Sequence, residues 1–124
     1  MTPKEVVQKG YEYFAPGDMT GMRSIMDENA TVRNNGMHKF SKTYKGADSF
    51  INNFIVHIQS HFGNFRVEPV KMIDEGEYVF VMYRATTDRM EADFGHFFKI
   101  ENEKITEFHI FDDSQKLAAT MKAL

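Results

Sequence analysis

The first apolar residues of the chain recur at helical spacing. Thr2 and Glu5 form a capping box with Pro3 at the first helical position, which predicts a helix that begins there. Pro16-Gly17 ends it. Its apolar face comprises Val6, Val7, Gly10, Tyr11 and Phe14. Asp18 then caps a second short helix that continues through Met26, and we expect the two helices to pack as a pair.

A wider apolar stripe follows Gly46 and predicts a third helix, the longest, which ends near Gly63. The stripe comprises Phe50, Ile51, Phe54, Ile55, Ile58 and Phe62. A last amphipathic helix is predicted from Ser114 to Ala123, with Leu117, Ala118 and Met121 on the side that docks.

The remaining segments have the character of strands. Residues 30–34 carry β-branched side chains, and Asn34-Asn35-Gly36 is a hairpin turn signal that predicts a return strand over about 38–44. Further strands are predicted over about 65–73, 78–87, 91–100 and 104–112, with turns at 74–76 and 101–103. This order of elements predicts a single α+β domain over residues 1–124, with helices on one face of a bent antiparallel sheet.

Both faces of the predicted sheet are apolar. In residues 78–83 the two alternating sides are equally hydrophobic, and the same holds at 97–98 and 108–111. Helices cover one side only, so a second copy of the chain is the simplest cover for the other. We therefore expect a homodimer formed through the outer face of the sheet.

Composition narrows the class of protein. The net charge is −3 and the sequence pI is about 5.9, with basic residues scattered along the chain, which argues against a nucleic-acid partner. Cysteine is absent, which excludes disulfides and thiolate chemistry. No apolar run is long enough to cross a bilayer and the N-terminus is too charged for a signal peptide, so a cytoplasmic protein without a membrane partner is expected. The 12 Phe and 9 Met suit a deformable cavity, or simply fill an irregular core.

Several segments together resemble the nuclear transport factor 2-like (NTF2-like) superfamily, especially its SnoaL-like and ketosteroid isomerase-related members. They are residues 14–18 (FAPGD), 26–32 (MDENATV), 44–46 (YKG), 96–100 (HFFKI) and 104–108 (KITEF). The resemblance implies a cystatin-like fold: a cone-shaped, strongly bent sheet with three helices on its concave face plus a short C-terminal helix. The fold hosts isomerases, cyclases, hydrolases and binding modules, so it does not name an activity.

The catalytic groups of steroid isomerases are missing from this chain. The resemblance places Asn34 at the position of their base, Gly10 at their tyrosine and Gly95 at their acid. An amide does not abstract a carbon-bound proton, and glycine has no side-chain donor. The ketosteroid isomerase mechanism is therefore not expected, and the two glycines are interpreted as space for a larger ligand.

Asp112 is the best candidate acid or base. Phe108 and Ile110 put it on the inward side of the last strand, and apolar surroundings favour proton transfer. The alternative, helix capping, is as well supported for Asp112 and is preferred for Asp113. Arg84 lies on the same side of its predicted strand as Met82, and it either reaches the pocket or forms an ion pair at the end of the sheet.

His57 and His61 lie one turn apart on the third predicted helix. A third ligand is not evident, so no metal is expected. No phosphate loop or dinucleotide fingerprint appears, so no cofactor is expected either. His57 is either a pocket residue that shuttles protons, the second catalytic candidate, or a half-buried helix flank. Asn34 is either a ligand hydrogen bonder or a turn residue, and Tyr11 or Tyr13 supplies a hydroxyl or packs in the core. His96 and His109 are assigned to the outer face.

These residues predict an apolar pocket of about several hundred Å³ for one lipophilic small molecule. Its expected lining is Tyr11, Phe14, Asn34, Phe54, Met82, Arg84, Phe97, Phe108 and Ile110. The chemistry would be cofactor-independent isomerisation, cyclisation or hydration. Convergence of the inward polar groups on one solvent-reachable cavity would favour this reading. If Asp112, Arg84 and His57 point to separate places, a non-catalytic binding or dimerisation module is favoured instead. An epoxide hydrolase-like site would need a second carboxylate, for which Asp93 is the weak candidate.

Overall fold

The computed structural model of the protein describes residues 1–122. Within this range the strands form a six-stranded sheet in the order β2-β1-β6-β5-β4-β3. The strands are β1 Met26–Asn34, β2 Thr43–Lys45, β3 Arg66–Glu75, β4 Tyr78–Thr86, β5 Glu91–Glu101 and β6 Lys104–Phe111. Neighbouring strands pair antiparallel except β1 and β6, which are parallel. The α+β class is confirmed.

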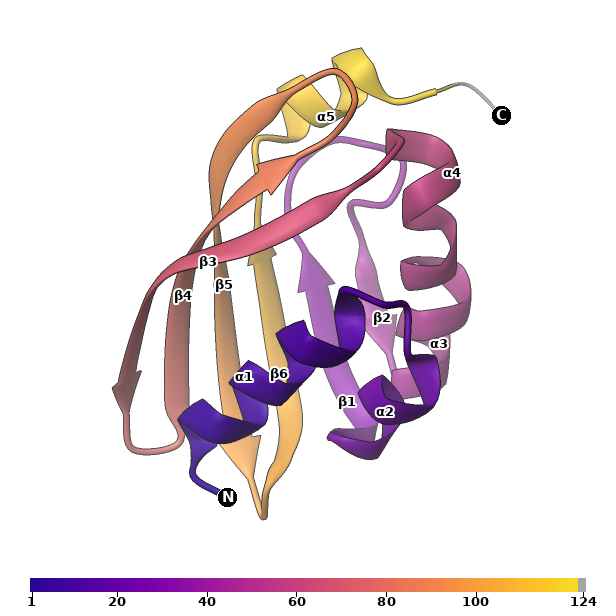
Figure 1. Ribbon diagram of the computed structural model, residues 1–124. Helices are drawn as coiled ribbons and strands as arrows, with labels where there is room; N and C mark the ends of the chain where they lie inside the picture. Colours follow the sequence, from indigo (N-terminus) through magenta and orange to yellow (C-terminus); the bar gives the residue numbers. More distant parts are fainter. Residues whose placement is uncertain (123–124) are drawn as a thin grey trace.

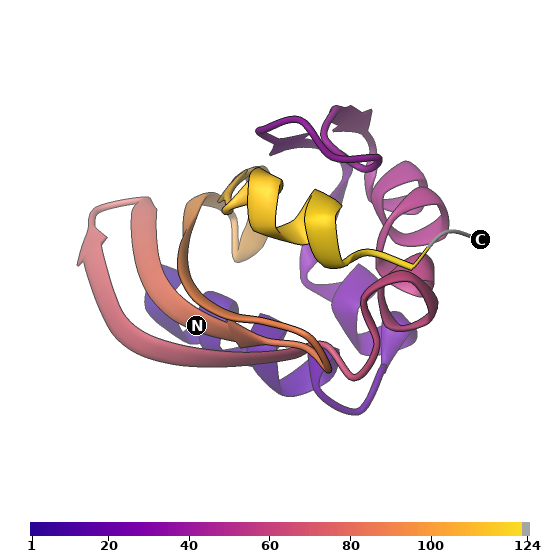
Figure 2. The same ribbon diagram turned by 90° about the horizontal axis from the view of Figure 1, so that it is seen from above.

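The helices are α1 Pro3–Phe14, α2 Met19–Ser24, α3 Ala47–Asn53, the 3₁₀ turn η1 Ile55–His57, α4 Ile58–Phe62 and α5 Ser114–Thr120. In Figure 1, α1 crosses the sheet, and α3 and α4 follow one another beside β1 and β2. Seen from above, the sheet curves around the interior and α5 lies across the open end, between the sheet and the α3–α4 segment (Figure 2). The Lys122 amide donates to the His61 carbonyl at 2.7 Å, so the chain after α5 is tied to α4.

The predicted ends of several elements are confirmed. Thr2 and Glu5 form the capping box of α1, and Asp18 accepts from the Gly21 amide at the start of α2. Asn102 and Glu103 both have positive φ, as the two-residue turn between β5 and β6 requires. The last helix ends at Thr120 rather than at Ala123, which lies outside the described residues.

The third predicted helix is not continuous. Phe54 leaves helical geometry (φ −129°, ψ −65°), and the chain passes through η1 before α4 begins at Ile58. The break occurs without proline or glycine. It keeps Phe54 and Ile58 both buried toward the interior, whereas Val56 and His57 are exposed.

The predicted return strand after β1 is present, since β2 pairs antiparallel with β1, but the predicted tight turn at residues 34–36 is wrong. The backbone amide and the side-chain amide of Asn35 both donate to the Ile110 carbonyl, which holds the chain beside β6 at this point, so it turns back later. Residues 35–42 therefore form a loop, and β2 is limited to Thr43–Lys45. The loop packs inward through Phe40, which is 4% exposed.

One irregularity decides which side chains of the sheet face the interior. Phe98 pairs with Phe108 and Lys99 with Glu107, but Ile100 pairs with Ile105, so β6 carries one extra residue, Thr106. A shift of one residue moves a whole strand's side chains to the other face. The inward residues are consequently Phe94, His96 and Phe98 on β5 and Val79, Val81, Tyr83 and Ala85 on β4.

No helix within residues 1–122 combines the length and the apolar character that crossing a bilayer requires.

Candidate functional site

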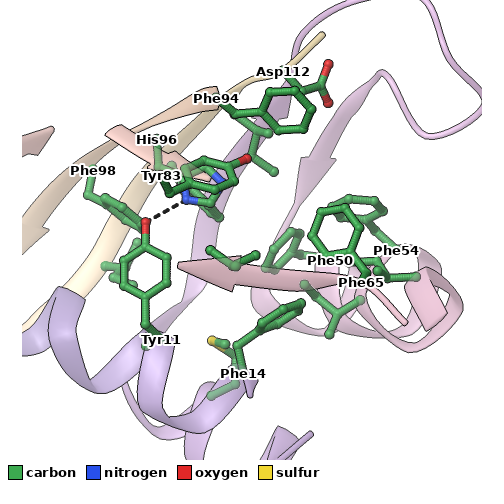
Figure 3. A pocket seen from close by; sticks show the side chains of 18 of the residues that line it. Tyr11, Phe14, Phe50, Phe54, Phe65, Tyr83, Phe94, His96, Phe98 and Asp112 are labelled. Carbon is green, nitrogen blue, oxygen red and sulfur yellow. Dashed lines mark hydrogen bonds between the residues drawn. The ribbon is translucent and has the colours of Figure 1, made fainter. Parts of the chain in front are cut away.

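An apolar cavity lies between the concave face of the sheet and the helices (Figure 3). Its volume is about 80 Å³, well below the several hundred Å³ expected from the sequence. The difference arises because bulky rings from every layer point inward and fill the concavity. The phenylalanines in its wall are Phe14, Phe50, Phe54, Phe62, Phe65, Phe94, Phe98 and Phe108.

Asp112 lies in the wall of this cavity, just after the end of β6. Its side chain is 3% exposed, and its Oδ2 accepts a hydrogen bond from His38 Nε2 at 3.0 Å. Its Oδ1 is buried without a hydrogen-bond partner among residues 1–122. A buried carboxylate oxygen without a partner is costly, and such groups concentrate at functional sites.

His38 reaches Asp112 from the loop that follows β1. Its Nδ1 accepts from the Phe40 amide at 3.0 Å, so Nε2 carries the proton and donates it to Asp112. Both ring nitrogens of His38 thus form hydrogen bonds. His38 therefore orients the carboxylate of Asp112 but has no free lone pair with which to accept a proton. The helix-capping role belongs to Asp113, whose Oδ1 accepts from the Lys116 amide. Asp112 therefore does not cap α5.

A second polar cluster lies in the same cavity wall. Tyr11 on α1 and His96 on β5 are joined by a hydrogen bond of 2.7 Å between the tyrosine hydroxyl and Nδ1. Figure 3 shows this contact, with the ring of Tyr83 beside His96; their centroids are 3.8 Å apart. Burial raises the pKa of Tyr11 and of Tyr83 above the ordinary tyrosine value and lowers the pKa of His96 well below 6.5. The cluster is therefore uncharged at neutral pH.

The low pKa of His96 predicts a loss of stability in mild acid. Below about pH 6.5 the unfolded chain binds a proton at this histidine that the folded protein does not, so stability falls as pH falls, by up to about 1.4 kcal/mol per pH unit. Urea unfolding between about pH 7.5 and about pH 5.5 measures this slope. In His96→Gln the slope should be shallower; an unchanged slope would remove His96 as its source.

The sequence correctly assigned part of the cavity wall. Of the predicted site residues, those that line the cavity are Tyr11, Phe14, Phe54, Phe108, Ile110 and Asp112. They lie on α1, on β6 and just after the ends of α3 and β6.

Met82, Arg84 and Phe97 were predicted to face the cavity but lie on the outer face of the sheet. Arg84 forms the ion pair considered as its alternative, with Nε 3.2 Å from Asp93 Oδ1. It does not reach Asp112, so an epoxide hydrolase-like Asp-Arg-Asp site is absent from the described residues. The error follows from the extra residue Thr106, which places Phe108 opposite Phe98 rather than Phe97.

The pocket roles predicted for His57 and Gly95 are wrong. His57 is exposed on η1 and does not line the cavity. His61 is engaged elsewhere, with Nδ1 donating to the His57 carbonyl and Nε2 accepting from Lys39 Nζ at 3.0 Å. A side chain at Gly95 would meet Phe80 and Phe111 on the outer face, so this glycine does not enlarge the cavity, whereas Gly10 lines it.

Asn34 is inward and 2% exposed, but it is not part of the cavity wall. Neither its amide nitrogen nor its amide oxygen has a hydrogen-bond partner within residues 1–122. The turn role considered for it does not apply, since its backbone amide donates to the Lys42 carbonyl instead.

The sequence missed three polar residues of the cavity: His38, Tyr83 and His96. His96 was predicted to lie on the outer face, and Tyr83 lies on the opposite side of β4 from Met82, which was predicted to face inward. Both residues were therefore missed because the wrong sides of β4 and β5 were taken to face the cavity. No local pattern identifies His38, because its position depends on how a loop without secondary structure folds.

A family model described as "SnoaL-like domain" matches residues 7–108. An NTF2-like protein of unknown function from Burkholderia pseudomallei superimposes with a TM-score of 0.84 at 22% identity, covering 98% of each chain. TerC, crystallised with polyporic acid, gives 0.80 at 23% identity over 95% of this chain and 96% of TerC. A candidate polyketide cyclase from Sinorhizobium meliloti gives 0.73 at 13% identity over 86% and 93%.

At these identities the solved structures establish the fold alone, and no functionally curated protein matches the sequence. The family model covers most of the chain and agrees with the curled sheet and its helices. The protein therefore belongs to the SnoaL-like domain family, within the NTF2-like fold.

Proposed function

We propose that the protein binds one compact lipophilic molecule in its cavity and moves a proton on it without a cofactor. The observation that carries the proposal is that five inward polar residues converge on a single cavity that is otherwise apolar: Tyr11, His38, Tyr83, His96 and Asp112. A few polar groups in an apolar pocket are the usual composition of a small-molecule site.

Asp112 is the proton carrier in this proposal. Oδ1 has no partner among the described residues, so it is the carboxylate oxygen with a free lone pair for an incoming proton. His38 holds the other oxygen and so fixes the orientation of the carboxylate. The size of the cavity favours a ligand built on one or two small rings.

Proteins of the same fold support this direction. One is a candidate polyketide cyclase, and another was crystallised with polyporic acid. The fold is thus associated with small organic ligands, and isomerisation or cyclisation is the class of reaction that the proposal favours here.

Benzisoxazole ring opening tests the proposal without knowledge of the natural substrate. A base removes the ring C–H proton, that electron pair completes a nitrile, and the N–O bond breaks to give a phenolate. Asp112 would receive the proton, with no cofactor needed. We expect the protein to accelerate the reaction relative to buffer, with saturation kinetics measured by phenolate absorbance. If benzisoxazole binds but its ring opening is not accelerated, the protein is a ligand-binding module and not a catalyst.

The alternative is a non-catalytic binding module. It is favoured by the fact that Arg84 and His57 lie outside the cavity and by the enclosure of Asp112, whose Oδ1 lies against the loop at Gly36. In that case Asp112 and His38 serve to hold residues 35–42 in place, and the cavity binds its ligand without changing it chemically.

We also propose that two copies of the chain associate through the outer face of the sheet. Large apolar side chains there are between 39% and 57% exposed: Ile73, Tyr78, Phe80, Met82 and Phe111. Charged groups at both ends of this outer-face patch are already ion-paired, Arg84 with Asp93 and Lys99 with Glu101, so they do not repel a second copy. Covering an apolar surface of this kind is the usual reason for self-association.

A further inference from the structure

The cluster formed by Tyr11, His96 and Tyr83 has hydrogen-bonding capacity that the protein does not use. The hydrogen bond between Tyr11 and His96 engages Nδ1 of the imidazole. Within residues 1–122 no hydrogen bond involves Nε2 of His96 or the hydroxyl of Tyr83, and both residues line the cavity. The question is whether these free groups are donors or acceptors.

The hydrogen bond to Tyr11 decides the tautomer of His96. If Nδ1 carried the proton, the Tyr11 hydroxyl proton would have no acceptor and Nε2 would be left as an unpaired acceptor. If Tyr11 donates to Nδ1, only Nε2–H is unpaired. The second arrangement leaves one group unpaired instead of two, so Nε2 carries the proton.

The cavity therefore presents two donors on neighbouring rings, Nε2–H of His96 and O–H of Tyr83, and neither has an acceptor within residues 1–122. The two rings are in contact, with centroids 3.8 Å apart. We infer that these two donors receive a carbonyl oxygen, and that the ligand is a compact aryl ketone or a similar flat carbonyl compound. The inference rests on the proposed function, in that it takes the cavity to be the ligand site.

The chemistry of the wall favours a neutral acceptor over a carboxylate. No Lys or Arg lines the cavity within the described residues, and burial keeps His96 in its neutral form. A buried anion would therefore lack a counter-charge, in addition to lying near the carboxylate of Asp112, whose charge acts on Tyr83. A carbonyl oxygen accepts two hydrogen bonds without that penalty.

The apolar wall favours a flat ring for the remainder of the ligand. Phe98 and Phe108 stack at 4.4 Å with an angle of 8° between their planes, and further phenylalanines enclose the space. In Figure 3, Tyr83 and His96 lie between Tyr11 and Asp112. A carbonyl held there would make the neighbouring C–H protons more acidic on the side of Asp112.

Acetophenone and ethylbenzene provide a matched pair of probes, because they differ only in that acetophenone has a carbonyl where ethylbenzene has a methylene. Each is titrated into the wild-type protein by NMR, and the infrared carbonyl stretch of bound acetophenone is recorded. We expect both to bind, with the bound carbonyl stretch lower in frequency than in a hydrocarbon solvent. Tyr83→Phe should weaken acetophenone binding about three- to tenfold and leave ethylbenzene unchanged.

Tyr11→Phe is the second variant and avoids dependence on one substitution. It removes the donor that fixes the His96 tautomer, so the shift of the carbonyl stretch should shrink, again with ethylbenzene binding unchanged. A carbonyl stretch at the hydrocarbon value in the wild type, or a shift that persists in both variants, would overturn the inference and leave the proposed function standing. If neither probe binds, the proposed function fails as well.

Discussion

Asp112→Asn should lower the rate of benzisoxazole ring opening by about a hundredfold or more, which is the usual contribution of a positioned general base. The reason is that an amide oxygen does not accept the proton that a carboxylate accepts. The fold should survive, because the asparagine oxygen can still accept the hydrogen bond from His38 Nε2. Initial rates at saturating benzisoxazole measure the effect, and circular dichroism checks the fold.

Asp113→Asn is the matched control for this substitution. The residue is adjacent in sequence, but its carboxylate caps α5 through the Lys116 amide and does not line the cavity. Asparagine caps helices about as well as aspartate, so both rate and stability should stay near the wild-type values. Equal rates in the two variants would mean that Asp112 is a structural partner of His38, and the base would have to be sought elsewhere.

Phe80→Glu should weaken self-association about a hundredfold or more, which corresponds to about 2.7 kcal/mol. Phe80 lies near the middle of the outer-face patch, 39% exposed and packed over Gly95. A carboxylate there would be buried without a counter-charge when a second copy docks. Sedimentation equilibrium over a range of concentrations measures the dissociation constant of wild type and variant.

Val56→Glu controls for the general effect of a new negative charge. Val56 is 52% exposed on η1, away from the sheet, so this variant should associate like the wild type. A wild-type protein that stays monomeric at all concentrations, or equal weakening by both substitutions, would rule out the outer face as the interface. The infrared experiment on the cavity is independent of this result.

The parts of the fold that depend on local chemistry were predicted well. The capping box at Thr2 and Glu5, the cap at Asp18 and the turn at 101–103 follow from hydrogen bonds and backbone angles within a few residues. Helix α1 was oriented correctly because its apolar and polar sides differ, and strand β6 because Phe108 and Ile110 were taken to mark its inward side. Residues of the cavity on these elements, including Tyr11 and Asp112, could therefore be named in advance.

The sequence by itself thus determined the α+β fold, the inward side of β6 and the presence of Asp112 in an apolar interior. Only the tertiary structure decided which side of β4 and β5 faces inward, since both sides are apolar and the extra residue Thr106 shifts the register. It also decided the partners of the site: His38 meets Asp112 from 74 positions away, and Tyr11 meets His96 from 85. Hydrophobic alternation reports only a contrast between two faces, and contacts between distant positions arise from packing that no local pattern contains.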